Sequence, residues 1–266
     1  KDYVECGGGN GANYAYNLAF WCNDVELFSI IGDDLYGKYL LNEFDEVGIN
    51  KDGIEIRKGY STPKSVIISN LANSTRTIVT TSREVIRKLN VNMSKDADII
   101  LLDGTYIESA KELLNNNKKA TIVFDLEKND PEIIELARTS NYIICSKDFA
   151  EEFTNIDLSN SSNIKRCYDM ISNYFIDSKV IITLGKDGSI TKDKDYIITK
   201  SIKVNSIDTT GSGDVFHAAF VHFLAKDYKL VDILKYSTIA AGLSTKKIGC
   251  RNKVPTMEEV LKHDFI

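Results

Sequence analysis

The sequence lacks the features of a secreted, membrane-bound or nucleic-acid-binding chain. No apolar run is long enough to cross a bilayer, and no signal peptide is visible. The five cysteines are scattered, odd in number and without a CxxC pair, which argues against a disulfide scaffold or a zinc site. The net charge of −5 gives no general attraction to nucleic acid or acidic membranes. We expect a cytoplasmic protein with reduced thiols.

Internal repeats and low-complexity linkers are also missing. A chain of 266 residues can bury one good core, so we expect one large domain, alone or with a lid. The hydrophobic content of 43% and the charged content of 27% are ordinary for a globular enzyme.

The most informative stretch is Asp-Thr-Thr-Gly-Ser-Gly-Asp at positions 208–214. It follows an apolar-alternating run and precedes a long apolar segment, which predicts a strand, a glycine turn and a buried helix. Gly211, Ser212 and Gly213 would then present backbone N–H groups at the first turn of that helix. Such a turn binds an anion, because unpaired donors and the positive end of the helix dipole coincide there.

Asp214 is unexpected beside an anion site, because a carboxylate weakens anion binding. It has a purpose if it accepts the proton of a hydroxyl that attacks a phosphate. The alternative is that it only caps the helix, as Asp often does. The spacing alone leaves both interpretations open.

A glycine cluster near the N-terminus allows two interpretations. Gly7-x-Gly9-x-x-Ala12 fits a dinucleotide fingerprint, which needs a strand before it and an acidic residue about 20 positions later. Asp33 and Asp34 lie somewhat far for that role.

The second interpretation is a glycine turn that opens a helix over residues 12–21. Asn10 and Asn13 would share a face of its first turn. Amide side chains both donate and accept, which suits a neutral polyol better than a phosphate. A role limited to capping stays open.

A lid is predicted between residues 52 and 83. Ahead of it, residues 25–31 read as a strand, and Asp34 as the N-cap of a helix over 36–47 that Gly48 ends. Residues 53–57, 64–69 and 75–80 then read as three short strands of a β-meander. One face of so small a sheet must be covered, by the main domain over substrate or by a second copy of the chain.

Strands and helices alternate from residue 97 onward. Strands are predicted over 98–102, 120–124, 141–145 and 180–184, with helices between them and over 230–244. This pattern indicates a parallel sheet covered on both faces, with ligands at the carboxyl ends of its strands. Two glycines, Gly185 and Gly188, follow Thr183 and let a backbone approach a ligand closely. Taken alone, this turn is an ordinary hairpin. His217 and His222 fall on a buried helix and are expected in the core or the pocket wall.

These motifs resemble those of the ribokinase-like (pfkB) carbohydrate kinases. The stretch 208–214 matches D-T-x-G-[AS]-G-D, and the N-terminal cluster matches G-G-x-x-x-N-x-A. The resemblance implies a three-layer α/β/α fold with a mostly parallel central sheet and a small β-sheet lid. It divides the chain into an α/β kinase domain over residues 1–51 and 84–266 and a lid over 52–83. The family normally has a strand ahead of this cluster that carries an acidic substrate contact; here it either lies before residue 1 or is lacking.

The resemblance also implies roles for individual residues. Asp214 would be the catalytic base, and Gly211, Ser212 and Gly213 the anion hole for the moving phosphoryl group. The remaining matched positions are Gly9, Asn10, Asn13 and Arg76 for the sugar, Thr183, Gly185, Lys186 and Gly188 for ATP, and Asp208 and Thr210 for a monovalent cation such as K⁺. Asn10 is more similar to the ketohexokinase and fructoselysine-kinase branches than to ribokinase, which has Lys there.

One position departs from the family pattern. The family commonly has N-x-x-E after the strand that ends near Cys145, where this chain has Ser146-Lys147-Asp148-Phe149. Ser-Lys-Asp is similar to the ketohexokinase variant. We therefore expect Mg²⁺ to be bound mainly through the phosphates of ATP.

The sequence thus predicts an ATP-dependent kinase that acts on a ketose, a fructosamine or a related sugar. A homodimer through the lid stays open. A nucleoside kinase of the same superfamily is an alternative, because Tyr14, Tyr16 and Phe28 could flank a base. An NAD-dependent oxidoreductase and a non-catalytic sugar-binding protein are alternatives of other classes.

Overall fold

The computed structural model describes residues 4–70, 75–81, 84–251 and 253–263. The side chains of residues 69, 70, 75 and 76 lie outside this description. All five cysteines are among the described residues and are free thiols. None of the helices in the described ranges is long and apolar enough to cross a membrane.

A six-stranded sheet forms the centre of the described part of the chain, in the order β10-β9-β8-β7-β6-β5. Neighbours from β5 to β8 are parallel, whereas β9 pairs antiparallel with both β8 and β10. The carboxyl ends of the four parallel strands therefore share one edge. The strands are β5 (Ile99–Leu102), β6 (Thr121–Leu126), β7 (Tyr142–Ser146), β8 (Lys179–Thr183), β9 (Ser189–Lys192) and β10 (Tyr196–Thr199).

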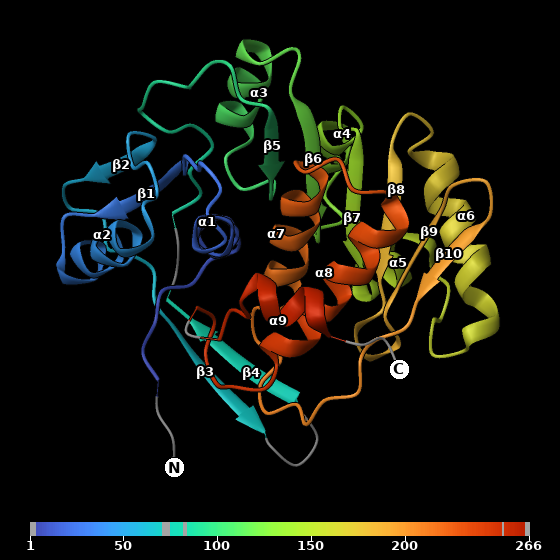
Figure 1. The fold of residues 1–266 in the computed structure, drawn as a ribbon. Coiled ribbons are helices and arrows are strands. Elements are labelled where there is room, and N and C mark those ends of the chain that lie inside the picture. The colour runs from blue at the N-terminus through green and yellow to red at the C-terminus, as the bar shows by residue number, and fades with distance from the viewer. Residues whose placement is uncertain (1–3, 71–74, 82–83, 252, 264–266) are drawn as a thin grey trace.

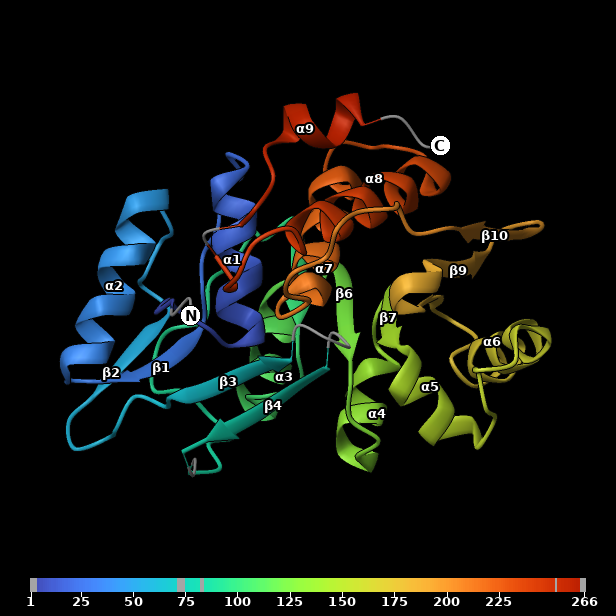
Figure 2. The same ribbon diagram turned by 90° about the horizontal axis from the view of Figure 1, so that it is seen from below.

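Helices cover both faces of this sheet, as the near-continuous apolar strands require. Alternate residues of a strand point to opposite faces, so Val123 packs into the cluster with α7 and α8, and Phe124 into the cluster with α3 to α6. Figure 2 shows these two layers on either side of the strands. The helices of this domain are α3 (Ile107–Asn116), α4 (Pro131–Ala137), α5 (Lys147–Thr154), α6 (Ile164–Tyr174), α7 (Ser212–Leu224), α8 (Leu230–Ser244) and α9 (Met257–Lys262). The predicted three-layer α/β/α architecture is confirmed.

Helix α2 (Leu35–Val47) begins and ends at its predicted cap residues, whereas α1 (Asn10–Phe20) begins two residues before its predicted start. The Asp34 carboxylate accepts from the backbone N–H of Gly37 at 2.8 Å and caps α2. Gly48 ends the helix in the left-handed region with φ 79°. A second oxygen of Asp34 accepts from the N–H of Thr62 at 2.9 Å. Asp34 is therefore a structural cap, as predicted.

The predicted three-stranded meander is wrong. Strand β2 (Ile54–Arg57) pairs in parallel with β1 (Ser29–Gly32), and only β3 (Ser65–Asn70) and β4 (Thr75–Thr80) form a separate antiparallel hairpin. Figure 1 shows this hairpin set apart from the central sheet. A short segment with Gly59 and Pro63 separates β2 from β3. Strand β2 pairs with β1 instead of continuing into the hairpin.

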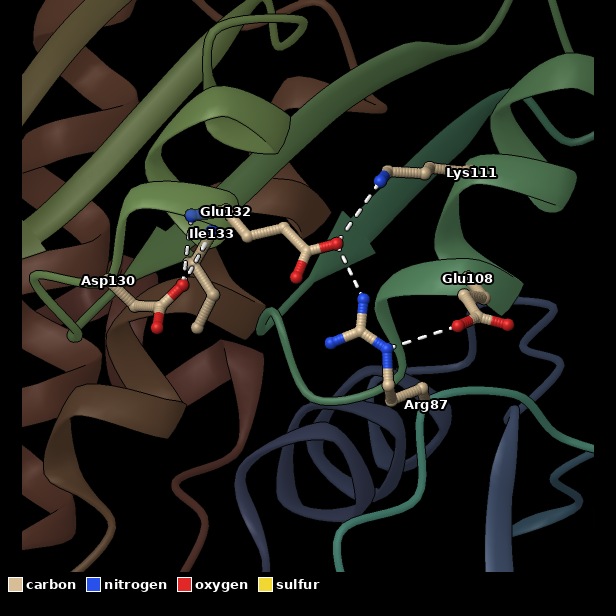
Figure 3. A network of polar contacts seen from close by, with 6 residues as sticks. All are labelled: Arg87, Glu108, Lys111, Asp130, Glu132 and Ile133. Atoms are coloured by element: carbon tan, nitrogen blue, oxygen red, sulfur yellow. Dashed lines mark hydrogen bonds and ion pairs between the residues drawn. The ribbon is translucent and has the colours of Figure 1, made fainter.

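The segment after the hairpin is tied to the main domain by a polar network, drawn in Figure 3. Arg87 donates to Glu108 of α3 at 3.0 Å and to Glu132 of α4 at 2.6 Å. Lys111 also pairs with Glu132, at 3.4 Å. Because these side chains are 40–52% exposed, each ion pair contributes only about 0–1 kcal/mol.

Candidate functional site

The glycine turn before α7 lies where the sequence predicts it. Gly211 has φ 74°, in the left-handed region that favours glycine, and its carbonyl accepts from the N–H of Val215 at 3.0 Å. The amide and the hydroxyl of Ser212 both donate to the carbonyl of Thr209, at 3.2 and 2.9 Å. Ser212 is thus a predicted anion-hole residue whose own donors hold the turn together. Gly213 is exposed at the start of the helix.

Asp214 and Asn13 meet although 201 residues separate them. The Asn13 amide nitrogen donates to Asp214 Oδ2 at 2.6 Å. Arg251 Nε donates to Asn13 Oδ1 at 3.3 Å, and this contact fixes which end of the amide faces the carboxylate. The two motifs singled out in the sequence therefore form one site, between the first turns of α1 and α7.

Asp214 has an unusual proton affinity. Burial, the largest effect, raises the pKa of Asp214 to about 7, and the Asn13 hydrogen bond opposes the rise. The negative charge of Asp125 raises this pKa further, whereas the charge of His217 lowers it. A carboxyl group with a pKa near neutrality can both accept and release a proton at physiological pH.

Three buried residues, His217, Asp125 and Tyr14, lie behind Asp214. His217, 5% exposed, places Nδ1 2.7 Å from the Gly213 carbonyl oxygen and Nε2 3.1 Å from Asp125 Oδ1, an ion-pair contact. The Tyr14 hydroxyl donates to Asp125 Oδ2, and its ring lies 5.5 Å from the His217 ring.

His217 is a buried cation. Both of its ring nitrogens face atoms that only accept, a carbonyl and a carboxylate oxygen, so both carry hydrogen. Burial lowers the pKa of His217, but the Asp125 carboxylate outweighs burial and the net pKa is raised to about 9. Asp125 near the carboxyl end of β6 was the signal that could have revealed this pair, since ligands and functional groups gather at that edge.

Asn10 faces a second group of carboxylates. Its amide nitrogen donates to Glu127 Oε2 at 3.0 Å and lies 3.5 Å from Asp125 Oδ2. Burial, together with the charge of Asp125, raises the pKa of Glu127. Gly9 occupies the N-cap position of α1 with φ 88°, and its carbonyl accepts from the N–H of Asn13 at 2.8 Å. Paired amides and carboxylates of this kind suit a ligand rich in hydroxyl groups.

The predicted nucleotide residues lie at the carboxyl end of β8, two strands from β6. Thr183 ends β8, and Gly185 and Gly188 have φ of 58° and 96°. A Cβ at Gly188 would lie 1.8 Å from the carbonyl oxygen of Thr199, so this position admits only glycine. Lys186 is exposed. No hydrogen bond among the described residues joins this turn to Asp214.

Two other stretches named in the sequence analysis, Arg76 and residues 146–149, are not part of this site in the described residues. The side chain of Arg76 lies outside the described residues, and its backbone pairs with Ser69 in the hairpin. Ser146 caps α5 through a 3.2 Å hydrogen bond from the N–H of Phe149. Phe149 is 1% exposed and belongs to the core, so the position that is acidic in the family pattern faces the interior here.

Arg251 joins the site to its surroundings. It is 3% exposed, pairs with Glu43 of α2, and donates to the Gly8 carbonyl at 3.3 Å. A Cβ at Gly7 would lie 1.9 Å from Arg251 Nη1, which explains the glycine there. No motif marks Arg251 as a site residue, because an arginine in a loop usually points to solvent.

Asp208 and Thr210 lie in the turn before Gly211. Asp208 Oδ1 accepts from the N–H and the hydroxyl of Thr210, at 3.0 and 2.7 Å, and Oδ2 accepts from the N–H of Gly249 at 3.0 Å. Burial raises the pKa of Asp208, but these hydrogen bonds outweigh it, so the pKa is lowered. The carbonyl oxygen of Asp208 accepts from Lys253 Nζ at 2.8 Å.

The fold and this site define a carbohydrate kinase of the ribokinase-like class. The family model of the pfkB family carbohydrate kinases matches residues 1–257 of this chain. The chain therefore belongs to that family.

Individual relatives are similar to this chain over most of its length. The chain is 30% identical to the ribokinase of Staphylococcus aureus (strain COL), over 96% of this chain and 86% of that one. It is 26% identical to the ribokinase of Haemophilus influenzae, over 98% and 88%. A 5-dehydro-2-deoxygluconokinase of Clostridium perfringens is 24% identical, over 95% and 82%.

Solved structures show the same fold. Arabidopsis thaliana ribokinase, complexed with ribose and ATP, superposes with a TM-score of 0.81 at 22% identity, covering 96% of this chain and 86% of that one. A fructokinase double mutant from Vibrio cholerae O395, bound to fructose, ADP and potassium, has a TM-score of 0.80 at 17% identity, covering 97% and 91%.

Replacing Arg251 by Met should lower the free energy of unfolding by about 3 kcal/mol, because it leaves the largely buried Glu43 without its charged partner. The matched control is Arg87→Met, which also removes an arginine with two carboxylate partners but at a half-exposed position. It should cost about 1 kcal/mol or less. Urea denaturation of the two variants measures both values, and equal losses would contradict the structural role given to Arg251.

Proposed function

We propose that the protein transfers the γ-phosphoryl group of ATP to a hydroxyl group of a sugar, with Asp214 as the base. The observation that carries the proposal is the contact of Asp214 with Asn13. It joins a carboxyl group with a pKa of about 7, at the helix start proposed to bind the phosphate, to an amide at the helix start proposed to bind the polyol.

In this mechanism Asp214 accepts the proton of the attacking hydroxyl as the new O–P bond forms. The amides of Gly211 and Gly213 donate to the phosphoryl oxygens and offset their charge, and the dipole of α7 adds to this effect. Ser212, whose N–H donates to the Thr209 carbonyl, supports this anion hole by holding the turn in shape. Asn10 and Asn13, with Gly9, orient the acceptor sugar, which supplies much of the rate. Arg76 of the hairpin is proposed to contact the sugar as well.

The nucleotide would enter as its magnesium complex. Thr183, Gly185, Lys186 and Gly188 at the end of β8 are proposed to line its site, with the two glycines allowing close approach. The absence of an acidic side chain at Phe149 supports magnesium binding through the phosphates. We keep as a proposal the division into a kinase domain of residues 1–51 and 84–266 and a lid of residues 52–83, in which the hairpin of β3 and β4 is the part that would move, since β2 pairs with β1.

Within this class we propose a ketose, a fructosamine or a related sugar as the substrate. Asn10 in place of Lys, and Ser146-Lys147-Asp148, support the ketohexokinase and fructoselysine-kinase branches. Because ribokinases and 5-dehydro-2-deoxygluconokinases are among the relatives, a substrate screen must also include the sugars that those enzymes phosphorylate.

The other candidate functions have less support. Tyr14 is 2% exposed and engaged with Asp125, so it is not available to stack on a nucleoside base. For a dinucleotide site, described residues 4–9 contain no strand, and Asp34 is occupied as the cap of α2. A sugar-binding protein without activity would have no use for a base at Asp214.

Asp214→Asn should leave ATP binding intact and lower turnover by about 10³-fold or more, because the amide cannot accept the hydroxyl proton. ADP release across ketoses, aldoses, fructosamines and nucleosides measures turnover, and calorimetry measures ATP binding. The control is Asp232→Asn, the same change in the first turn of α8, which should keep full activity. An active Asp214→Asn variant would refute the proposal.

The pH dependence follows from the same carboxyl group. Asp214 works only when ionised, so kcat/KM should fall about tenfold per pH unit below its pKa of about 7 and level off above it. In His217→Gln the cation that favours ionised Asp214 is lost, so the fall should move about one unit to higher pH.

His222→Gln is the matched control for this shift. His222 lies on the same helix, is 2% exposed, and burial lowers its pKa to about 4, so it is neutral before and after the change. Its pH profile should stay with that of the native protein. Coincident profiles for His217→Gln and the native protein would contradict the electrostatic role of His217.

The hairpin is proposed to serve both as a lid and as a dimer contact. Val66 and Val79 lie opposite one another and are 64% and 60% exposed, and Ile67 and Ile78 on the other face are 38% and 51% exposed. A two-stranded ribbon that is apolar on both faces needs a cover for each. The substrate side of the main domain could take one face and a second copy the other.

Val79→Lys should therefore convert a dimer to a monomer, since a buried lysine opposes association. Sedimentation velocity measures the change. Val231→Lys, at a residue 49% exposed on α8, is the control and should remain dimeric. A monomeric native protein at micromolar concentration would rule out the dimer.

A further inference from the structure

The monovalent-cation position expected at Asp208 and Thr210 does not fit a free cation. The three hydrogen bonds to the Asp208 carboxylate, from Thr210 and Gly249, come from the protein itself. The Asp208 carbonyl oxygen accepts from Lys253 Nζ at 2.8 Å. The carboxylate and carbonyl oxygens of Asp208 are therefore already bound to donors of this chain.

Lys253 brings a full positive charge into this position. It is 3% exposed and Asp208 is 6% exposed, so the ammonium and the carboxylate are both buried. The charge of Lys253 is one of the causes, after burial and the hydrogen bonds, that act on the pKa of Asp208. A second monovalent cation on the same carbonyl would sit beside an ammonium in a region of low dielectric constant, and the two would repel strongly.

The position of this ammonium matters for the anion hole. Thr210 directly precedes Gly211, and Gly249 belongs to the loop after α8. In that loop Cys250 lies 3.6 Å from where a Cβ of Gly211 would be. A cation bound to Asp208 therefore holds together the two loops that shape the start of α7.

We propose that the ammonium of Lys253 takes the place of the monovalent cation, so that this protein needs no potassium for activity or for the order of its anion hole. The activity part of this inference rests on the proposed kinase function. The structural part does not, because it concerns only which cation occupies the position beside Asp208.

The first test uses the native protein. Its rate of sugar-dependent ADP release should differ by less than about twofold between potassium and tetramethylammonium as the only monovalent cation, the latter being too large for the position. Its melting temperature should be the same in both salts at equal ionic strength. Activation by potassium of about tenfold or more, or a melting temperature that rises with potassium, would overturn the proposal.

The second test removes the ammonium, which should make the protein depend on potassium. Lys253→Met should lose at least about tenfold in rate in tetramethylammonium, and potassium or ammonium should restore part of the rate and raise its melting temperature. A Lys253→Met protein whose melting temperature ignores potassium would count against the proposal. Lys253→Arg keeps the charge and should stay independent of potassium, and Lys246→Met, at an exposed lysine of the same loop, should behave as native.

The two proposals fail in different ways. If the native protein releases no ADP with any sugar in either salt, the proposed kinase function fails. The melting temperatures of the native protein and of Lys253→Met still decide whether the ammonium or a free cation belongs beside Asp208.

Discussion

The hydrogen bond between Asn13 and Asp214 is the constraint on which the site depends. It joins the first turns of α1 and α7, so the proposed sugar and phosphate positions share one reference point. Its direction is set by Arg251, which donates to the other end of the Asn13 amide and is itself held by Glu43 and the Gly8 carbonyl. The orientation of one amide thus depends on a chain of contacts that begins in α2.

Charge balance is the second theme of the site. Asp125, Glu127 and Asp214 carry like charges at close range, and the charge of Asp125 raises the pKa of Glu127 and of Asp214. His217, held as a cation by Asp125, limits this effect at Asp214. A pKa near 7 is therefore the result of opposing causes, with burial raising it and the Asn13 amide and His217 lowering it. This balance is what a base needs in order to accept a proton and release it again.

Local patterns were enough to predict the layered fold and the two motifs, because each depends on residues close in sequence. The alternation of β6, β7 and β8, the cap at Asp34 and the positive φ of Gly211 are properties of short segments. The pairing of β2 with β1 was not predictable in this way, since a short strand carries no mark of its partner. The same limit hid Asp125, His217 and Arg251, whose roles arise from contacts between segments more than 90 residues apart.

Lys253 is a part of this position that the motif of residues 208–214 does not predict. The stretch 208–214 places Asp208 and Thr210 in the turn before Gly211, where the Asp208 carboxylate accepts from the N–H and the hydroxyl of Thr210. It does not specify the charge that faces the Asp208 carbonyl, because that charge comes from a loop some 45 residues later. An ammonium tethered to the chain has no concentration dependence, whereas a free ion must be recruited from solution. A cation built into the chain thus makes the turn independent of the ionic composition around the protein, at the cost of burying a lysine that must keep its partner.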